Sequence, residues 1–420
     1  MEYGKLGNTD IEVSKLCVGC MSFGKAGTMH DWTLDEAESE NVIKHALDLG
    51  YNFFDTANGY SAGTSEEYLG KALKKNVARN QVVIASKVYF NEGRLSRQAI
   101  MREIDGTLSR LGTDYLDLYI IHRFDYDTPI EETMEALHDL VKAGKVRALG
   151  ASAMYGYQFY NMQLAARDNG WTPFSAMENH YNLLYREDER ELLPICKQMK
   201  VSLMPYSPLA AGHLARPQWK SESLRGTTDR VAMGKYDKTE AEDMQIVKRV
   251  AELAEKYNCK MSQIAIAWQW AKGILSPIIG ATKTQYLDDS AGAFDIKLTA
   301  EDLAYLEEPY VPHPGLRTLQ KLPASRIAAQ GQESRSIRAA ENGRAAAPLA
   351  VMHTAYSCAR GQELPQEVGN RFCRQQGLVC REKSPGVGFT MSLDGAAQRR
   401  SHTFSRLTVP YDVNALSPAG

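Results

Sequence analysis

Four titratable residues end or follow three apolar runs in the first third of the chain. The run YNFFD ends at Asp55, with Tyr60 five residues later, VVIASK ends at Lys87, and LDLYIIH ends at His122. A phenol with its ordinary pKa of about 10 transfers protons poorly at neutral pH, and a neighbouring ammonium lowers that pKa by favouring the phenolate. If the four side chains meet, Lys87 would tune Tyr60, Asp55 would keep Lys87 charged and oriented, and His122 would orient a carbonyl oxygen.

This set of groups favours one kind of chemistry. It suits protonation of an oxygen as a hydride arrives at the adjacent carbon, and such a step requires no metal. It contains no nucleophile–base pair of the kind that acyl transfer uses. The sequence also lacks G-x-x-x-x-G-K-[ST] and H-E-x-x-H, which disfavours P-loop NTPases and zinc proteases. We therefore expect no metal site.

Short apolar segments alternate with longer amphipathic ones over the first 314 residues. The predicted strands are Lys15–Gly19, Tyr51–Asp55, Val82–Lys87, Leu116–His122, Ala148–Ala151, Ala176–Asn179, Ser202–Tyr206 and Pro277–Ile279. The predicted helices span 33–49, 64–75, 96–111, 130–144, 155–169, 187–199 and 240–272, and Ser96 stands where a helix N-cap is expected. The charge-rich stretch 187–191 is expected to be a solvated face.

Eight strands alternating with helices predict a parallel (β/α)8 TIM barrel. The alternative is a doubly wound open sheet, but that fold usually carries G-x-G-x-x-G after its first strand, and the motif is absent. In a barrel the carboxyl ends of the strands form the active-site rim, so Asp55, Tyr60, Lys87 and His122 are expected to converge there.

Composition narrows the class of protein. The 420 residues contain 49 basic and 51 acidic ones, and this near-balance argues against a dedicated nucleic-acid binder or a polybasic membrane binder. No apolar run reaches the roughly 18 residues of a membrane span, and the first residues, MEYGKLGNTD, lack the apolar stretch typical of a signal peptide. Seven cysteines in a chain of this length are no disulfide scaffold. We expect a cytoplasmic protein.

The chain divides at about Pro314. Residues 315–420 hold 14 basic and 7 acidic side chains, a net charge of +7, so residues 1–314 carry 49 − 14 = 35 basic and 51 − 7 = 44 acidic ones, a net of −9. Leu, Ile, Val and Phe make up 20 of those 106 C-terminal residues, too few to build a core easily. We expect 1–314 to be the catalytic barrel and 315–420 to be largely disordered. The C-terminal segment is either a basic regulatory or targeting tail or an appended, incorrect reading frame.

The motifs around the four titratable residues resemble the aldo-keto reductase superfamily. The resemblance rests on GYNFFDTANGYSAGTSEEYLGKAL, VVIASK and LSRLGTDYLDLYIIH, and it extends from about Tyr3 to Pro314. It implies a (β/α)8 barrel that binds NADPH across the strand ends and reduces aldehydes and ketones. By position, Asp55, Tyr60, Lys87 and His122 match the catalytic tetrad of that family, with Tyr60 as proton donor.

The resemblance also assigns cofactor positions, on GASAM, AMENHYNL, YSPLAAGHL and PIIGATKTQYLDDS. They are Ser152, Glu178, Tyr206, Ser207, Leu209, Gly212, Gly280, Thr282, Lys283 and Asp289. Ser152 and Glu178 would hold the nicotinamide carboxamide, and Tyr206 would stack on its ring. The residues Ser207, Leu209 and Gly212 would surround the pyrophosphate, and the remaining four would face the adenosine.

Some positions in these four segments depart from the family pattern. Ala153 replaces the usual Asn, Glu178 replaces Gln, and Lys283 stands where many members have Arg. An ionised Glu178 can only accept hydrogen bonds, so Asn179 would have to compensate. Lys283 keeps the charge that favours NADPH over NADH but loses the guanidinium fork.

The HYNLLYREDERELLP run and the insert at 213–240 resemble the YajO-like and fungal aryl-alcohol dehydrogenase or secondary-metabolite branch. The same frame occurs in potassium-channel beta subunits, so a nucleotide-sensing binding module is the alternative to an enzyme; nothing in the first 40 residues resembles a partner-binding arm. Four aromatic residues after strands one, three and four would line a substrate site or simply pack the barrel rim: Trp32, Tyr89, Phe90 and Phe124. The expected partner is a small, aromatic or bulky carbonyl compound. The sequence does not define the oligomeric state.

Overall fold

The computed structural model describes residues 1–313 and the two short segments 378–381 and 390–393. The chain forms two compact units, Met1–Lys321 and Leu322–Gly420. In the second unit β11 (Leu378–Arg381) and β12 (Thr390–Leu393) pair antiparallel. The expectation of disorder over 315–420 otherwise lies outside the described residues. No helix in the described part of the chain is long and apolar enough to cross a bilayer.

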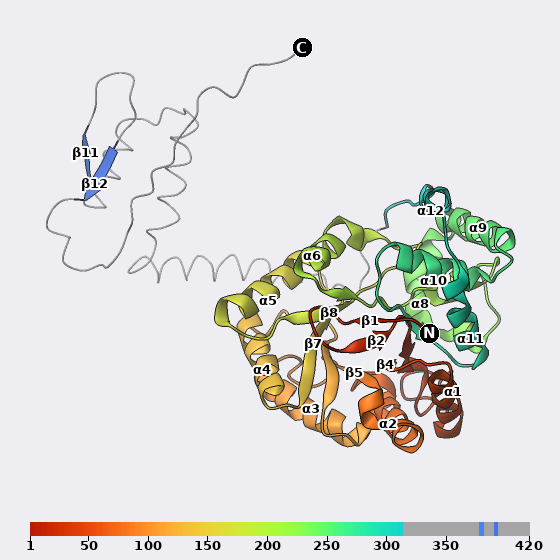
Figure 1. Ribbon diagram of the computed structural model, residues 1–420, viewed down its shortest axis with the longest axis horizontal. Coiled ribbons are helices and arrows are strands. Elements are labelled where there is room, and N and C mark those ends of the chain that lie inside the picture. Colours follow the sequence, from red (N-terminus) through yellow and green to blue (C-terminus); the bar gives the residue numbers. More distant parts are fainter. Residues whose placement is uncertain (314–377, 382–389, 394–420) are drawn as a thin grey trace, which may run out of the picture. The chain divides into compact units, whose positions relative to one another are not determined.

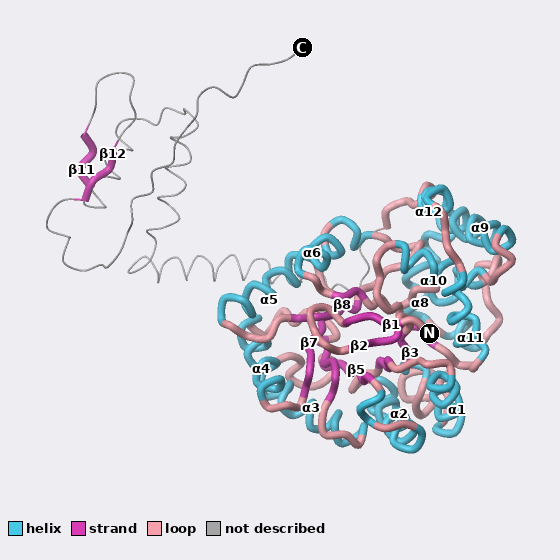
Figure 2. The backbone as a smooth tube through the Cα atoms, in the orientation of Figure 1, coloured by secondary structure: helices cyan, strands magenta, loops and turns pink. Residues whose placement is uncertain are grey.

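The first unit is built around an eight-stranded parallel sheet with the order β10-β3-β4-β5-β6-β7-β8-β9 (Figures 1 and 2). Its strands are β3 (Cys17–Gly19), β4 (Phe53–Asp55), β5 (Val83–Val88), β6 (Leu116–Ile121), β7 (Val146–Ser152), β8 (Phe174–Glu178), β9 (Ser202–Leu203) and β10 (Ile278–Gly280). The two end strands also meet, because the backbone N–H of Ile278 donates to the carbonyl of Pro205 over 3.0 Å just beyond β9. The sheet thus curls into the predicted (β/α)8 barrel, and the open doubly wound alternative is wrong.

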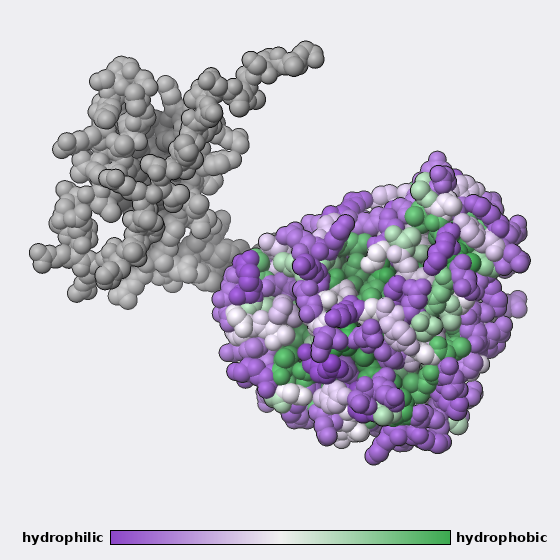
Figure 3. All heavy atoms as spheres, in the orientation of Figure 1, coloured by the Kyte–Doolittle hydropathy of each residue, from purple (hydrophilic) through white to green (hydrophobic). Residues whose placement is uncertain are grey.

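Helices surround this sheet, and the first six follow one another round it in chain order (Figure 1). They are α1 (Glu36–Asp48), α2 (Thr64–Asn76), α3 (Arg97–Leu111), α4 (Ile130–Lys142), α5 (Gly156–Asn169), α6 (Leu192–Met199), α7 (Leu224–Thr228), α8 (Arg230–Tyr236), α9 (Glu240–Lys256), α10 (Met261–Ala271), α11 (Gln285–Ala291) and α12 (Ala300–Glu307). The predicted N-cap Ser96 accepts from the backbone N–H of Ala99 at the start of α3. Hydrophilic side chains dominate the outer rim of the barrel in this view (Figure 3).

Two predicted helices differ in the structure, and the one over 187–199 is a 3-10 helix, Glu187–Arg190, followed by α6. The stretch 240–272 is two helices, α9 and α10, because the backbone turns at Asn258, which adopts a left-handed φ of 49°. Asparagine tolerates that conformation better than most residues. The apolar spacing continues on both sides of the break, which is why it reads as one helix in the sequence.

A short hairpin covers the amino-terminal end of the barrel. It consists of β1 (Tyr3–Lys5) and β2 (Glu12–Ser14), and its Leu6, Ile11 and Val13 belong to the apolar core inside the barrel. At the turn, the N–H of Gly7 donates to the Ser202 hydroxyl over 2.7 Å. Gly7 has a φ of +57°, and a Cβ there would lie 2.4 Å from the carbonyl oxygen of Ser175. Only glycine fits this approach, so the hairpin closes one end and leaves the other for the site.

Candidate active site

The alternation of side chains along the strands directs the candidate residues to the barrel mouth. Residues that share a face of a strand are two apart. The apolar core inside the barrel contains Phe53, Val83, Ala85, Leu118, Ile120, Ala148 and Ala176. Continuing the same faces toward the carboxyl ends gives Asp55 on β4, Lys87 on β5 and His122 after β6. It also gives Ser152 on β7 and Glu178 on β8.

Lys87 is the centre of this cluster and is fully buried. Its ammonium donates to the Asp55 carboxylate over 2.6 Å, to the carbonyl of Thr56 over 2.9 Å and to the hydroxyl of Tyr60 over 3.1 Å. Three N–H bonds are all that an ammonium has to donate. Burial alone would lower the pKa of Lys87, but the carboxylates of Asp55 and Glu178 outweigh it and raise the pKa. Lys87 therefore stays charged.

Tyr60 accepts a hydrogen bond from Lys87, which leaves its own proton free for another acceptor. Burial raises the pKa of Tyr60, and Lys87 offsets that rise only in part. The sequence-based expectation of a net lowered pKa is therefore wrong, although the Lys87 charge acts in the expected direction. The neutral phenol is the stable form, as a proton donor requires.

The backbone beside Tyr60 is strained. Ser61, Ala62 and Gly63 follow it with φ of 46°, 53° and 90°, three consecutive left-handed residues. The left-handed conformation destabilises a non-glycine residue by about 1–2 kcal/mol. Such strain is typical of functional sites, where the surrounding fold holds one side chain in place.

His122 is the fourth residue of the predicted catalytic tetrad. Its ring meets the ring of Tyr60 edge-on, with centroids 5.7 Å apart. Burial, Lys87 and Arg123 together hold the pKa of His122 well below its usual range. The imidazole is therefore neutral and keeps one N–H as a donor. The structure brings Asp55, Tyr60, Lys87 and His122 together at one end of the barrel.

Glu178 joins this cluster as a second carboxyl group. Its Oε2 lies 3.5 Å from the Lys87 ammonium, too far for a hydrogen bond, and has no hydrogen-bond partner among the described residues. Burial and the charge of Asp55 raise the pKa of Glu178, with partial opposition from Lys87. Glu178 thus favours its protonated form, in which the carboxyl can donate as well as accept.

Buried polar atoms without partners lie beside Glu178. They include the Ser152 hydroxyl on β7 and the Oδ1 of Asn179, while Nδ2 of Asn179 donates to Asp188 over 2.9 Å. Buried polar atoms normally find hydrogen-bond partners, so three unsatisfied ones at adjacent strand ends call for a ligand with both donors and acceptors. A carboxamide has both, so this set fits the nicotinamide end of a dinucleotide.

The loop after β9 carries the next group of predicted cofactor residues. Ser207 has a φ of 56°, and Leu209 directly precedes the turn Ala210–Ala215, in which Gly212 has a φ of 97°. The Ser207 carbonyl accepts from Asn182 over 2.9 Å. Tyr206 stacks on His180 with centroids 5.2 Å apart. These residues lie next to the β8 end, as a cofactor crossing the strand ends requires.

The predicted adenosine positions lie further round the rim, at and after β10. Gly280 and Lys283 are exposed and Thr282 is half-buried. Asp289 is half-buried on α11, and its carboxylate pairs with Lys260 over 2.6 Å. The carboxylate of Asp289 is thus already paired with Lys260 before any ligand binds.

The four predicted substrate residues lie in different places in the structure. Phe90 is 51% exposed, and its ring lies edge-on to His122 with centroids 4.9 Å apart. Tyr89 is buried in the apolar core between sheet and helices. Trp32 stacks on His30, and Phe124 lies edge-on to Tyr126. Among the four, Phe90 makes a ring contact with the tetrad, and the ring contacts of Trp32 and Phe124 lie elsewhere on the rim.

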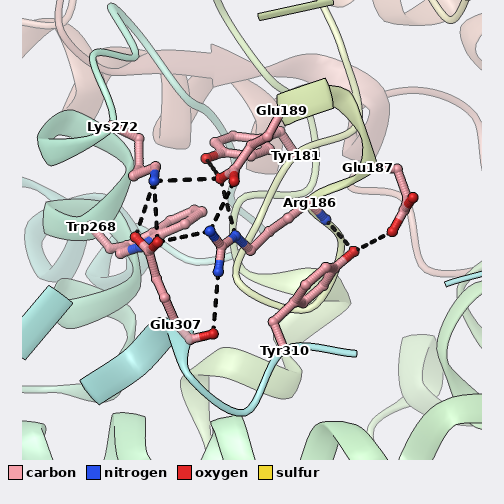
Figure 4. A network of polar contacts seen from close by, with 8 residues as sticks. All are labelled: Tyr181, Arg186, Glu187, Glu189, Trp268, Lys272, Glu307 and Tyr310. Carbon is pink, nitrogen blue, oxygen red and sulfur yellow. Dashed lines mark hydrogen bonds and ion pairs between the residues drawn. The ribbon is translucent and has the colours of Figure 1, made fainter. Parts of the chain in front are cut away.

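A polar network fixes the loop that follows β8 (Figure 4). Arg186 binds Glu189 over 2.8 Å and Glu307 over 2.7 Å, and Tyr310 donates to Glu187 over 2.8 Å. The side chains of Trp268 and Lys272 also bind Glu307. The expectation that 187–191 is a solvated face is therefore wrong for Glu187, Asp188 and Glu189, which are half-buried.

Sequence reasoning missed residues that the fold brings to this end of the barrel. Tyr236, which comes from α8 in the insert, contacts Nε2 of His180 through its hydroxyl over 2.7 Å. Lys235 lies over the ring of Tyr206, 4.6 Å from its centroid. Arg123 directly follows His122, and this position in the sequence could have marked it as a residue of the site.

Comparison with known sequences defines the class of this protein. The sequence model of the Aldo/keto reductase family matches residues 15–310. The chain belongs to that family, and it is an oxidoreductase of the (β/α)8 type.

Two relatives and one solved structure show which members it resembles. The chain is 43% identical to the versiconal hemiacetal acetate reductase of Aspergillus parasiticus, covering 76% of this chain and 100% of that one. It is 43% identical to a putative aryl-alcohol dehydrogenase of Schizosaccharomyces pombe, over 74% of this chain and 96% of the relative. A crystal structure of the thermostable aldo-keto reductase Tm1743 with the inhibitor epalrestat superposes with a TM-score of 0.59 at 30% identity, covering 74% of this chain and 100% of that one. The predicted resemblance to the fungal aryl-alcohol dehydrogenase branch is confirmed.

Proposed function

We propose that this protein is an NADPH-dependent reductase of aldehydes or ketones in which Tyr60 donates the proton. The observation that carries the proposal is the buried contact of 3.1 Å from the Lys87 ammonium to the Tyr60 hydroxyl, backed by Asp55 at 2.6 Å. The family and its relatives named as reductases and dehydrogenases support carbonyl chemistry.

The residues at the barrel mouth suit a nicotinamide cofactor. Ser152, Glu178 and Asn179 would hold the carboxamide through the buried atoms that lack partners, and Tyr206 would face the ring. The ammonium of Lys283, exposed beyond β10, supports the choice of NADPH over NADH because it can meet a 2′-phosphate. When bound, the cofactor supplies the hydride for the carbonyl carbon.

The chain supplies the proton and orients the oxygen. Tyr60 donates its proton to the carbonyl oxygen, so that hydride and proton together convert C=O into CH–OH. His122, held neutral, donates its N–H to the same oxygen. Lys87 stabilises the tyrosinate that remains, and Asp55 holds Lys87 in place and charged.

The described cysteines support an intracellular, reducing location. Cys17, Cys20, Cys196 and Cys259 are free thiols in the described part of the chain. Free thiols are typical of the cytosol, where we propose that the protein works.

Oxidation of NADPH against a panel of aliphatic and aromatic aldehydes, ketones and quinones tests the proposal, with NADH in parallel. We expect turnover of at least one carbonyl class and a lower KM for NADPH than for NADH. Tight NADPH binding with no turnover of any class would instead favour the nucleotide-sensing binding module. The relatives named as reductases do not favour that alternative.

A further inference from the structure

An arginine beside the tetrad has no role in the proposed chemistry. Arg123 directly follows His122, is half-buried, and places its guanidinium over the ring of Phe90, 5.0 Å from the centroid. The edge of Phe90 meets the His122 ring in turn. The charge of Arg123 reaches the tetrad, because it helps to lower the pKa of His122. Arg123 therefore lies within electrostatic reach of the reaction point.

Arg123 also differs from its neighbours in lacking an acidic partner. Arg94, on the adjacent loop, lies over Tyr89 in the same way but pairs with Asp127 over 2.7 Å and with Asp125 over 3.6 Å. Within residues 1–313, neither an ion pair nor a hydrogen bond engages the side chain of Arg123. A half-buried guanidinium that meets only an aromatic face retains its donors for an anion.

A second cation, Lys235, lies within electrostatic reach of Arg123. Lys235, on α8, lies over Tyr206 and likewise forms no ion pair within residues 1–313, since the nearby Asp229 binds Arg225 over 3.3 Å. Burial lowers the pKa of Lys235 to about 8; Asp229 opposes the shift, and Arg123 and Arg225 add to it. The charges of Arg123 and Lys235 thus act unfavourably on each other, and an anion bound near both would relieve that repulsion.

We propose that Arg123, assisted by Lys235, binds an anionic group of the substrate, so that this enzyme prefers aromatic carbonyl compounds that carry a carboxylate. The exposed ring of Phe90 offers an aromatic surface beside the guanidinium, and the same ring contacts His122 with centroids 4.9 Å apart. This inference rests on the proposed reductase function and names its substrate class.

The cofactor is a weaker explanation for Arg123. The predicted phosphate-facing residues follow β9 and β10, whereas Arg123 follows β6 next to His122. Arg225 is the arginine near the β10 end, where its Nη1 would lie 4.0 Å from a Cβ on Gly280. Arg123 is thus placed for the substrate rather than for the phosphates.

Paired substrates that differ only in charge test the inference. The ratio of kcat/KM for para-carboxybenzaldehyde to that for its methyl ester measures the preference, and the meta isomers repeat it at a second geometry. We expect the native enzyme to prefer the acids, and Arg123→Gln to reduce the ratio at least about tenfold, the value of one charge-assisted hydrogen bond. Arg123→Lys should retain most of the preference, and Lys235→Gln should reduce it by a smaller factor.

Controls separate this inference from the underlying function. Arg94→Gln, whose arginine is already paired, should leave the ratio unchanged, and the dissociation constant for NADPH should be the same in Arg123→Gln as in the native protein. An absence of preference for the acids, an equal loss on acid and ester, or weakened NADPH binding in Arg123→Gln would overturn the inference. Failure of the native enzyme to reduce either compound would overturn the substrate class, and failure across the whole carbonyl panel would overturn the proposed function.

Discussion

The Lys87 ammonium donates a hydrogen bond of 3.1 Å to the Tyr60 hydroxyl from a fully buried position. The Asp55 carboxylate, 2.6 Å away, offsets the desolvation of this buried charge, and Glu178 lies 3.5 Å away. One ammonium therefore serves two purposes: it is the counter-ion of the buried Asp55 carboxylate and it orients the phenol.

Lys87→Met should cost both stability and activity. Removal of the ammonium leaves Asp55 buried without its counter-ion, and breaking a buried pair typically costs about 3–5 kcal/mol. Urea unfolding measures the loss. The double variant Asp55→Asn/Lys87→Met should recover part of the stability but no turnover. Equal stability of Lys87→Met and native protein would show that the pair is not buried as described.

Glu178→Gln should change how stability depends on pH. The pKa of Glu178 rises from 4.5 to about 8 in the folded protein. Between these values the folded carboxyl keeps a proton that the unfolded chain has lost, so stability falls as pH rises through this window. Thermal unfolding from pH 5 to 8 should show native protein losing stability relative to Glu178→Gln. Parallel curves would show that Glu178 titrates normally.

Gly7→Ala should destabilise the hairpin more than strain alone explains. A Cβ at Gly7 would lie 2.4 Å from the Ser175 carbonyl oxygen, whereas Gly112 shares a positive φ of +63° but has nothing within 4 Å. Gly112→Ala should therefore cost about 1–2 kcal/mol from the left-handed backbone. Gly7→Ala should cost clearly more in chemical unfolding. Equal costs would mean that the hairpin can move away from β8.

A chain ending at Pro314 should fold and keep its activity. The last described contacts before Pro314 are those of Tyr310 and His313. The His313 backbone N–H donates to Glu187 over 3.0 Å, and its ring lies 3.1 Å from the Asp243 carboxylate. All of these survive in the shortened chain, so residues 315–420 should be dispensable. Unfolding curves and NADPH oxidation check this, and a shortened chain that aggregates or loses turnover would show that the tail contributes.

The barrel and the tetrad could be predicted from the sequence because both depend on local patterns. Each strand is a short apolar run, and the two-residue alternation that buries Val83 and Ala85 also turns Lys87 inward. The polar residue that ends such a run is therefore visible before the fold is known.

What the sequence hides depends on contacts between distant segments. Glu189 is half-buried and is bound by Arg186 and by Lys272 at the end of α10. No pattern in the sequence around Glu189 indicates that α10 packs against it. The position of Lys235 over Tyr206 depends in the same way on where the insert folds back. The hairpin strands have three residues each, too short for a periodic signal.

Turnover by Tyr60→Phe tests the central claim most directly, with NADPH binding measured on the same sample. The substitution removes one hydroxyl and keeps the ring against His122, so NADPH should bind with nearly native affinity. Carbonyl reduction should fall by roughly 10²–10⁴ or more, the usual contribution of a positioned acid. A variant that binds NADPH and still turns over within a few fold of the native rate would contradict the assignment of Tyr60 as proton donor.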